Sequence, residues 1–286
     1  MICPGHPGRA SASCQPFDRT KHSLREGNHA EPSPSGHRGA GQTACARAAA
    51  AGDPARRHGT RAAAGGERTR RAVRRDPKVT LACLTFGERG ESAKAWREGR
   101  TLAEIKALRR EEAERSAATL GAEVRFFDAG DYPLAVTPEL TDRLVEVYRA
   151  TQPDVVLTHP VEDPYNGDHP AANRMALEAR VLAQAIGYPG EGEIIGAPPV
   201  FYFEPHQPEM SGFRPEVLLD ITEGWETKRK AMECLAAQRH LWDYYTDLAV
   251  RRGVQLRRNA GPLGLAHRTM AEAYMRPYPQ IAKELA

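Results

Sequence analysis

The sequence predicts an α/β protein with a three-layer, Rossmann-like architecture, in which helices cover both faces of a mostly parallel sheet. Short apolar, β-branched segments alternate along the chain with amphipathic helical segments, as in parallel βαβ units. The 286 residues are 41% apolar and 27% charged, so the chain can bury a sizeable core. No stretch approaches 18 consecutive apolar residues, so we expect no membrane span and no membrane partner.

The first elements of the pattern are a strand, a helix and a second strand. Residues 79–86 (VTLACLTF) are a short apolar run that ends at Gly87, which is typical of a buried parallel strand. Residues 103–120 repeat their apolar positions at helical spacing, and Gly121 is the expected stop. The second strand is predicted over 124–127.

The alternation continues through the rest of the chain. Thr137 is a typical N-cap and Pro138 fits the first helical position, so the next helix begins there. A third strand over 155–158 leads into a third helix over 171–185. Beyond these, the pattern predicts strands at 200–203 and 217–220 and a helix from about 224 to 240.

The first quarter of the chain differs in composition from the rest. Residues 1–75 carry a formal charge of +9 against −6 for the remainder, and they hold few large apolar side chains. Such a segment cannot offset its ordering entropy by burial, so residues 1–76 are expected to be disordered or mistranslated. The segment lacks interleaved aromatic residues, which argues against a nucleic-acid partner. The folded domain is expected over 77–286.

The start of the chain also bears on location. It shows no secretory signal, and the five scattered cysteines include no C-x-x-C pair. We therefore expect a cytoplasmic protein without a thiolate zinc site.

Two polar loops are expected at the carboxyl edge of the sheet, where open α/β sheets bind ligands. Residues 87–92 (GERGES) follow the first strand, and residues 159–169 (HPVEDPYNGDH) follow the third. Both loops offer acids and bases, so we expect them to converge on one divalent cation.

The second loop offers metal ligands and acid/base groups. Imidazole and carboxylate side chains suit a divalent transition metal, zinc above all. His169 is the better ligand candidate because it lies just before a helix, whereas His159 and Asp168 are candidates for acid/base catalysis. A surface loop can also carry such residues without a function. Two further histidines, His240 and His267, are interpreted as structural.

The first loop offers proton transfer and anion binding. Glu91 lies deep in the loop, where a carboxylate near a metal can move protons to or from a substrate or water. Glu88 is expected to lie in a solvated turn. Arg89 and Lys94 can pair with an anionic substrate, or they can be ordinary surface charges.

Several separate motifs together resemble one family. The run PDVVLTHPVEDPYNGDHPAA at 153–172, with the GERGES loop before it, is similar to the LmbE-like or PIG-L metal-dependent deacetylases. Within that superfamily, FEPHQPE at 203–209, AAQRHLWDYYT at 236–246 and RRGVQLRRN at 251–259 resemble the 4-oxalomesaconate hydratases. The resemblance covers roughly residues 79–281. It implies addition of water to an enolisable tricarboxylate in the breakdown of gallate and protocatechuate.

The resemblance also implies roles for individual residues. His169 falls on a zinc-binding histidine of the family, and Glu91 falls on its acidic loop residue. Asn166 stands where many deacetylases have another histidine, which weakens the case for deacetylation. Asn166 and His206 are expected to contact the substrate, although His206 can equally be a locally bonded loop residue.

The family pattern is incomplete near the start of the chain. Family members begin with a strand that runs into His-Pro-x-Asp, whose His and Asp supply two further zinc ligands. About thirty residues before Phe86, this chain reads RRHGTR at 56–61, with no apolar strand and no Asp. Because three protein ligands are the norm at a catalytic zinc, we expect the chain as written to hold little metal and to be nearly inactive.

The predicted function is hydration of 4-oxalomesaconate with zinc or another divalent metal. Glu91 moves the proton, and cationic residues such as Arg89 and Lys94 hold the substrate carboxylates. Two alternatives stay open. One is zinc-dependent N-deacetylation of an amino sugar or related amide, and the other is a metal-free binding protein with a basic tail. A homo-oligomer is expected.

Overall fold

The computed structural model of this protein describes residues 78–260, 265 and 267–281. The segment expected to be disordered or mistranslated, residues 1–76, lies outside the described residues. None of the helices in the described ranges is long and apolar enough to cross a membrane.

The first elements that the structure describes form a βαβ unit. The strand β1 (Thr80–Cys83) pairs in parallel with β2 (Glu123–Phe126). Between them lie a short helix, α1 (Ala93–Arg97), and the long helix α2 (Leu102–Thr119). The strand β1 is shorter at both ends than the predicted 79–86, and β2 lies one residue earlier than the predicted 124–127, but their order and parallel pairing are as expected.

The bounds of α2 follow from local chemistry at its two ends. The Thr101 side chain accepts the backbone N–H of Glu104, and the Glu104 carboxylate accepts the backbone N–H of Thr101 at 2.7 Å, which is a capping box. After the helix, Gly121 adopts a φ of 64°, in the left-handed region that glycine enters without strain. The predicted stop at Gly121 is therefore confirmed.

A second sheet holds the remaining strands. The strand β3 (Val156–Thr158) pairs in parallel with β4 (Val200–Phe203). A strand that the sequence pattern did not predict, β6 (Ala271–Met275), lies antiparallel between β4 and β5 (Val217–Asp220). Within the described residues, no strand joins the β1–β2 pair to this second sheet.

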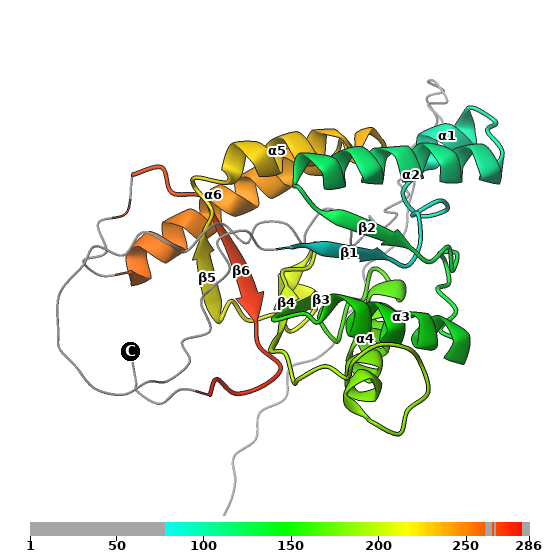
Figure 1. Ribbon diagram of the computed structural model, residues 1–286. Coiled ribbons are helices and arrows are strands. Elements are labelled where there is room, and N and C mark those ends of the chain that lie inside the picture. The colour runs from blue at the N-terminus through cyan, green and yellow to red at the C-terminus, as the bar shows by residue number, and fades with distance from the viewer. Residues whose placement is uncertain (1–77, 261–264, 266, 282–286) are drawn as a thin grey trace, which may run out of the picture. The chain divides into compact units, whose positions relative to one another are not determined.

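Helices lie on both faces of the strands, as the predicted fold class requires. The helices α3 (Pro138–Thr151) and α4 (Asp168–Gln184) pack against each other on one side (Figure 1). On the other side α2 packs against α5 (Trp225–Glu233), which contacts α6 (Leu241–Asn259). The α/β architecture with covered sheet faces is thus confirmed.

The main hydrophobic core lies among α3, α4, β3 and β4. Thr137 caps α3 by accepting the backbone N–H of Leu140, as predicted, and the buried apolar side chains of α3 pack against α4. The buried side chains of this core include Leu144, Val145, Met175, Ala179, Val200 and Tyr202. This packing fixes α4, whose first turn carries site residues.

The helix expected over 224–240 is divided in the structure. The helix α5 ends at Glu233, a 3₁₀ turn follows at Ala236–Gln238, and α6 begins at Leu241. The break places the residues between the two helices beside the loop that follows β1, which matters for the site.

Candidate functional site

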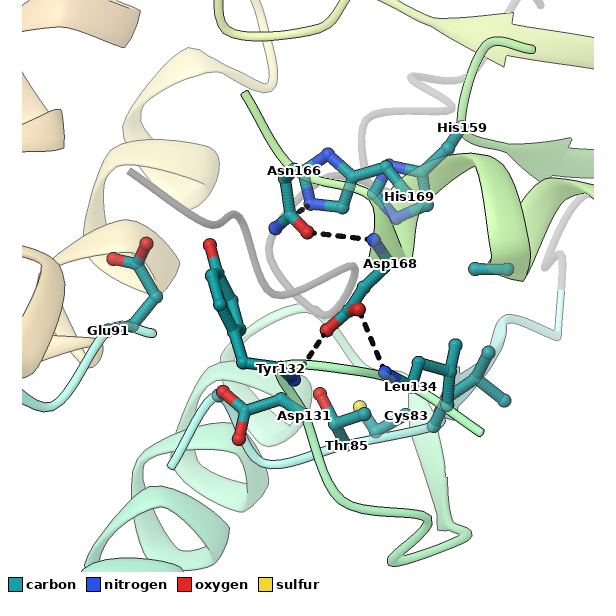
Figure 2. A pocket seen from close by; sticks show the side chains of 13 residues that line it. Cys83, Thr85, Glu91, Asp131, Tyr132, Leu134, His159, Asn166, Asp168 and His169 are labelled. Carbon is teal, nitrogen blue, oxygen red and sulfur yellow. Dashed lines mark hydrogen bonds between the residues drawn. The ribbon is translucent and has the colours of Figure 1, made fainter. Parts of the chain in front are cut away.

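A cavity lies where the loops after β1 and β3 meet (Figure 2). Five residues selected from the sequence line it, namely Glu91, His159, Asn166, Asp168 and His169. The two polar loops therefore line one cavity, while their predicted convergence on a divalent cation stays a prediction.

The loop after β1 is a tight turn that directs Glu91 inward. Gly87 adopts a φ of 69°, and its carbonyl accepts the backbone N–H of Glu91 at 3.2 Å and the Ser92 hydroxyl at 3.1 Å. Only 3% of the Glu91 side chain is exposed. Its Oε1 atom has no hydrogen-bond partner among the described residues, so it is available to a molecule in the cavity.

The environment of Glu91 makes it a group that titrates near neutrality. Burial raises the pKa of Glu91 from 4.5 to about 7. A hydrogen bond from Gln238 and the charge of Arg109 oppose this rise, while the charge of Asp131 adds to it. A carboxyl group with such a pKa can both accept and donate a proton at physiological pH.

Asp131 ties the loop after β2 to the loop after β1. Its carboxylate accepts the backbone N–H of Arg89 at 3.0 Å and that of Gly90 at 2.8 Å. The Arg89 guanidinium donates to the Asp131 carbonyl at 2.7 Å, with half of the Arg89 side chain exposed. Asp131 lines the cavity but was not identified from the sequence, although it too follows a strand and could have been selected by that rule.

Tyr132 is a second cavity residue that the sequence reasoning missed. Its ring lies between Glu91 and the histidines in Figure 2. The ring sits against Gly90, where an added Cβ atom would lie 2.4 Å from Tyr132 Cε2. Burial, with the neighbouring charges of Glu91 and Asp168, raises the pKa of Tyr132 to about 12, so its hydroxyl stays protonated and can donate to a ligand.

Asp168 holds the loop that carries Tyr132 through two hydrogen bonds. Its two carboxylate oxygens accept the backbone N–H groups of Tyr132 at 2.9 Å and Leu134 at 2.8 Å. The helix α4 begins at Asp168, three residues before the predicted start. Because both oxygens are engaged, this placement favours a positioning role over the acid/base role expected from the sequence.

His169 is buried and held from both ring nitrogens. Asp163 Oδ2 lies 2.8 Å from His169 Nδ1, and Asn166 Nδ2 lies 3.1 Å from His169 Nε2. The His159 ring stacks on the His169 ring with centroids 4.0 Å apart. Burial opposes ionisation of Asp163, but hydrogen bonds from His169 and from the backbone N–H groups of Tyr165 and Asn166 outweigh it and lower the pKa of Asp163.

Comparisons with known proteins show which family this chain resembles. A family model described as GlcNAc-PI de-N-acetylase, PIG-L, matches residues 62–180. A 4-oxalmesaconate hydratase of Pseudomonas putida is 52% identical over 208 residues, which are 72% of this chain and 80% of that protein. The chain belongs to the PIG-L family.

Solved structures show the same relationship. The crystal structure of a 4-carboxy-2-hydroxymuconate hydratase from Pseudomonas putida has a TM-score of 0.70 and 50% identity, covering 73% of this chain and 88% of that one. An N,N'-diacetylchitobiose deacetylase from Pyrococcus horikoshii has a TM-score of 0.55 at 23% identity, covering 69% of this chain and 72% of that one. The deacetylase therefore shares the fold, whereas the hydratase is similar at the level of sequence as well.

The PIG-L family implies a divalent metal, and the described residues fit it only in part. The Asp163 carboxylate orients His169 Nδ1 as in many metal-bound histidines, but the Asn166 amide lies 3.1 Å from Nε2 and would have to move for that atom to bind a metal. No group of three His, Cys, Asp or Glu side chains suited to a metal occurs in the part of the chain that the structure describes. A catalytic zinc normally has three protein ligands, so we route no chemical step through a metal.

Two residues expected to bind substrate lie apart from the cavity lining. Lys94 is 88% exposed and pairs with Glu98 at 3.7 Å. The His206 ring contacts the Tyr244 ring, with centroids 4.3 Å apart. The substrate-binding roles of Lys94, His206 and Arg89 therefore remain predictions. The cavity lining formed by the described residues contains no Lys or Arg.

The expectation that Glu88 lies in a solvated turn was wrong. Glu88 is fully buried, and its carboxylate accepts the backbone N–H of Phe86 at 3.1 Å and lies 3.7 Å from Lys106 Nζ. Its carbonyl also accepts the Trp96 indole N–H at 2.8 Å. Glu88 therefore fixes the start of the loop that carries Glu91.

Proposed function

We propose that this chain is a hydro-lyase that adds water to a carbon–carbon double bond of 4-oxalomesaconate, an enolisable unsaturated tricarboxylate. The observation that carries the proposal is the buried Glu91 carboxyl in the cavity, with a pKa near neutrality, in a chain about half identical to a hydratase sequence and to a solved hydratase structure. Hydration needs a group that removes a proton from water and returns one to carbon, and Glu91 suits both steps.

In the proposed reaction Glu91 takes up one proton and later returns one, so its protonation state is the same before and after the cycle. As a carboxylate, Glu91 accepts a proton from the attacking water, whose oxygen bonds to one carbon of the double bond. The conjugated carbonyl or carboxylate of the substrate takes up the electron pair as an enolate. Glu91 as a carboxylic acid then gives the proton to the neighbouring carbon, which restores the starting form of the enzyme.

The residues around Glu91 orient the reactants. We assign Asp131 and Asp168 to positioning, because their carboxylates hold the loops that carry Glu91 and Tyr132. The protonated Tyr132 hydroxyl and the Asn166 amide would donate to substrate oxygens. His159, stacked on the buried His169, stays our candidate for a further acid/base group.

We propose zinc as the ion and His169 as one of its ligands. Support comes from the family and from the Asp163 carboxylate behind His169. Metal analysis of the purified full chain and of His169→Ala tests this. At least half an equivalent of zinc in the wild type and none in the variant is expected if a metal site forms, and equal contents would contradict it.

We propose that residues 77–286 form the catalytic domain and that the protein is located in the cytoplasm. We propose that the protein binds a small polycarboxylate substrate and that it binds neither nucleic acid nor membranes. We also propose that it forms a homo-oligomer. Sedimentation of the full chain tests the oligomer, where a monomer at micromolar concentration would contradict it.

Two assays in parallel separate the candidate functions. Hydration removes the conjugated double bond, so the ultraviolet absorbance of 4-oxalomesaconate should fall when the full chain is added with zinc. Deacetylation of an N-acetylated amino sugar releases acetate, which a coupled assay detects. Loss of absorbance without acetate release supports the hydratase, whereas the reverse supports the deacetylase. Neither reaction, with no bound metal, supports the binding protein.

A further inference from the structure

The turn between α5 and α6 reaches the site from a part of the chain distant in sequence. Gln238, which is buried, hydrogen-bonds the Glu91 carboxyl, and His240 Nε2 lies 4.0 Å from Glu91 Oε2. The sequence analysis interpreted His240 as structural. Its position beside the proton-transfer candidate calls for a different interpretation.

A buried ion pair fixes the turn against the site loop. On α2, Arg109 pairs with Glu112, and both side chains are almost wholly buried. Arg109 donates to the carbonyl of Phe86 at 3.0 Å, at the start of the loop that carries Glu91. Glu112 accepts the backbone N–H of Ala237 at 3.1 Å, within the turn. The Arg109–Glu112 pair thus contacts both the loop that carries Glu91 and the α5–α6 turn that carries His240. These buried contacts keep the two segments next to each other.

The two groups differ in their access to solvent. The Glu91 side chain is 3% exposed, whereas that of His240 is 56% exposed. His240 therefore touches bulk water on one side and approaches the buried carboxyl on the other. The 4.0 Å separation suits a transfer through one water molecule or after a small side-chain movement.

Of the described groups around Glu91, His240 is the one suited to proton exchange near neutral pH. Arg109 does not lose its proton in proteins. Asp131 is buried with its oxygens engaged by backbone N–H groups, and Tyr132 has a pKa of about 12. Burial lowers the pKa of His240 from its usual value of 6.5, so its neutral imidazole can accept a proton at pH 7.

We propose that His240 exchanges the proton of Glu91 with solvent, as a residue that acts through Glu91. In this step the Glu91 carboxyl gives its proton to the neutral imidazole, which leaves a carboxylate and an imidazolium, and the imidazolium then releases the proton to water. The reverse sequence reloads Glu91. This inference rests on the proposed proton-transfer role of Glu91.

The test compares His240→Gln with the matched control His267→Gln. Gln keeps a polar side chain of similar reach but does not titrate, and His267 is an exposed histidine outside the cavity lining. Difference infrared spectroscopy of the full chain follows the carboxyl band of Glu91, assigned by its loss in Glu91→Gln. After a jump in pH, the Glu91 carboxyl band should relax about tenfold more slowly in His240→Gln than in wild type, because the neutral imidazole that accepts its proton is gone, and the control should relax at the wild-type rate.

Kinetics provide the second readout. In D₂O, His240→Gln should slow the exchange of the carbon-bound hydrogen of the hydrated product for deuterium by about tenfold, because that hydrogen reaches solvent through Glu91, and added imidazole should restore part of the rate. An unchanged relaxation of the Glu91 band together with an unchanged exchange rate would overturn the role of His240 while leaving Glu91 in place. Full turnover in Glu91→Gln would instead overturn the role of Glu91 and, with it, this inference. Slower exchange in His240→Gln that imidazole does not restore, with unchanged relaxation of the Glu91 band, would show a structural role and also overturn the proposal.

Discussion

Replacing Glu91 by Gln should make the protein more stable at alkaline pH while removing its proton-transfer group. The folded state keeps the Glu91 proton up to a pKa of about 7, whereas the unfolded chain releases it near 4.5. The folded state thus binds more protons between these values, so the free energy of unfolding falls as pH rises through this window. The difference of about 2.5 pKa units corresponds to roughly 3 kcal/mol.

Urea unfolding at about pH 4.5 and about pH 8, with chelator present, measures this effect. We expect the stability of Glu91→Gln relative to wild type to improve by roughly 3 kcal/mol between the two pH values. The matched control is Glu98→Gln, because Glu98 is a glutamate with 44% side-chain exposure near the same loop. The control should show almost no such change. If Glu91→Gln behaves like the control, Glu91 does not retain a proton in the folded state and the electrostatic reasoning fails.

Two further predictions concern the stability of the fold, one at the site and one at the helix α6. Asp163→Asn weakens the partner of His169, so it should lower stability by about 1–3 kcal/mol at pH 7. Because the pKa of Asp163 is lowered, this difference should shrink as pH falls below about 4, and urea unfolding that shows a constant difference down to pH 2 would contradict it. Gly253→Ala places a Cβ atom 1.7 Å from the Thr269 carbonyl oxygen, so it should cost about 3 kcal/mol, and a melting temperature within about 2 °C of wild type would refute the clash.

The fold was predictable where local chemistry decides it. The capping threonines and Gly121 set the ends of α2 and α3 through hydrogen bonds and φ, which short motifs encode. The strand β6 was missed because its sequence, AEAYM, is rich in the helix formers Ala and Glu. Its state depends on pairing with β4 and β5, which a local pattern does not contain.

The site was predictable to the extent that it follows from strand ends. The loops after β1 and β3 were selected because ligands bind at the carboxyl edge of parallel strands, and both line the cavity. The role of Glu88 was misjudged, because its burial depends on Lys106 and on the backbone of its own turn. Sequence alone gives residue types, and these do not reveal which charged side chain the fold encloses.

The buried pair Arg109–Glu112 illustrates the same limit. On a helix, an Arg and a Glu three residues apart predict a solvated face. In the structure both are buried, because Arg109 meets the Phe86 carbonyl and Glu112 meets the backbone of Ala237. The approach of the α5–α6 turn to Glu91 depends on these long-range contacts, which explains why His240 was interpreted as structural.

The most direct measurement is the rate at which the full chain, supplied with zinc, consumes 4-oxalomesaconate at pH 7, with wild type and Glu91→Gln compared at equal folded concentration. The His-Pro-x-Asp motif is missing, so the wild-type rate is expected to be low, but a buried carboxyl that carries the proton in both directions predicts a rate above background in the wild type and a loss of about 100-fold or more in the variant. Equal rates for the two proteins would contradict the claim that Glu91 moves the proton during water addition.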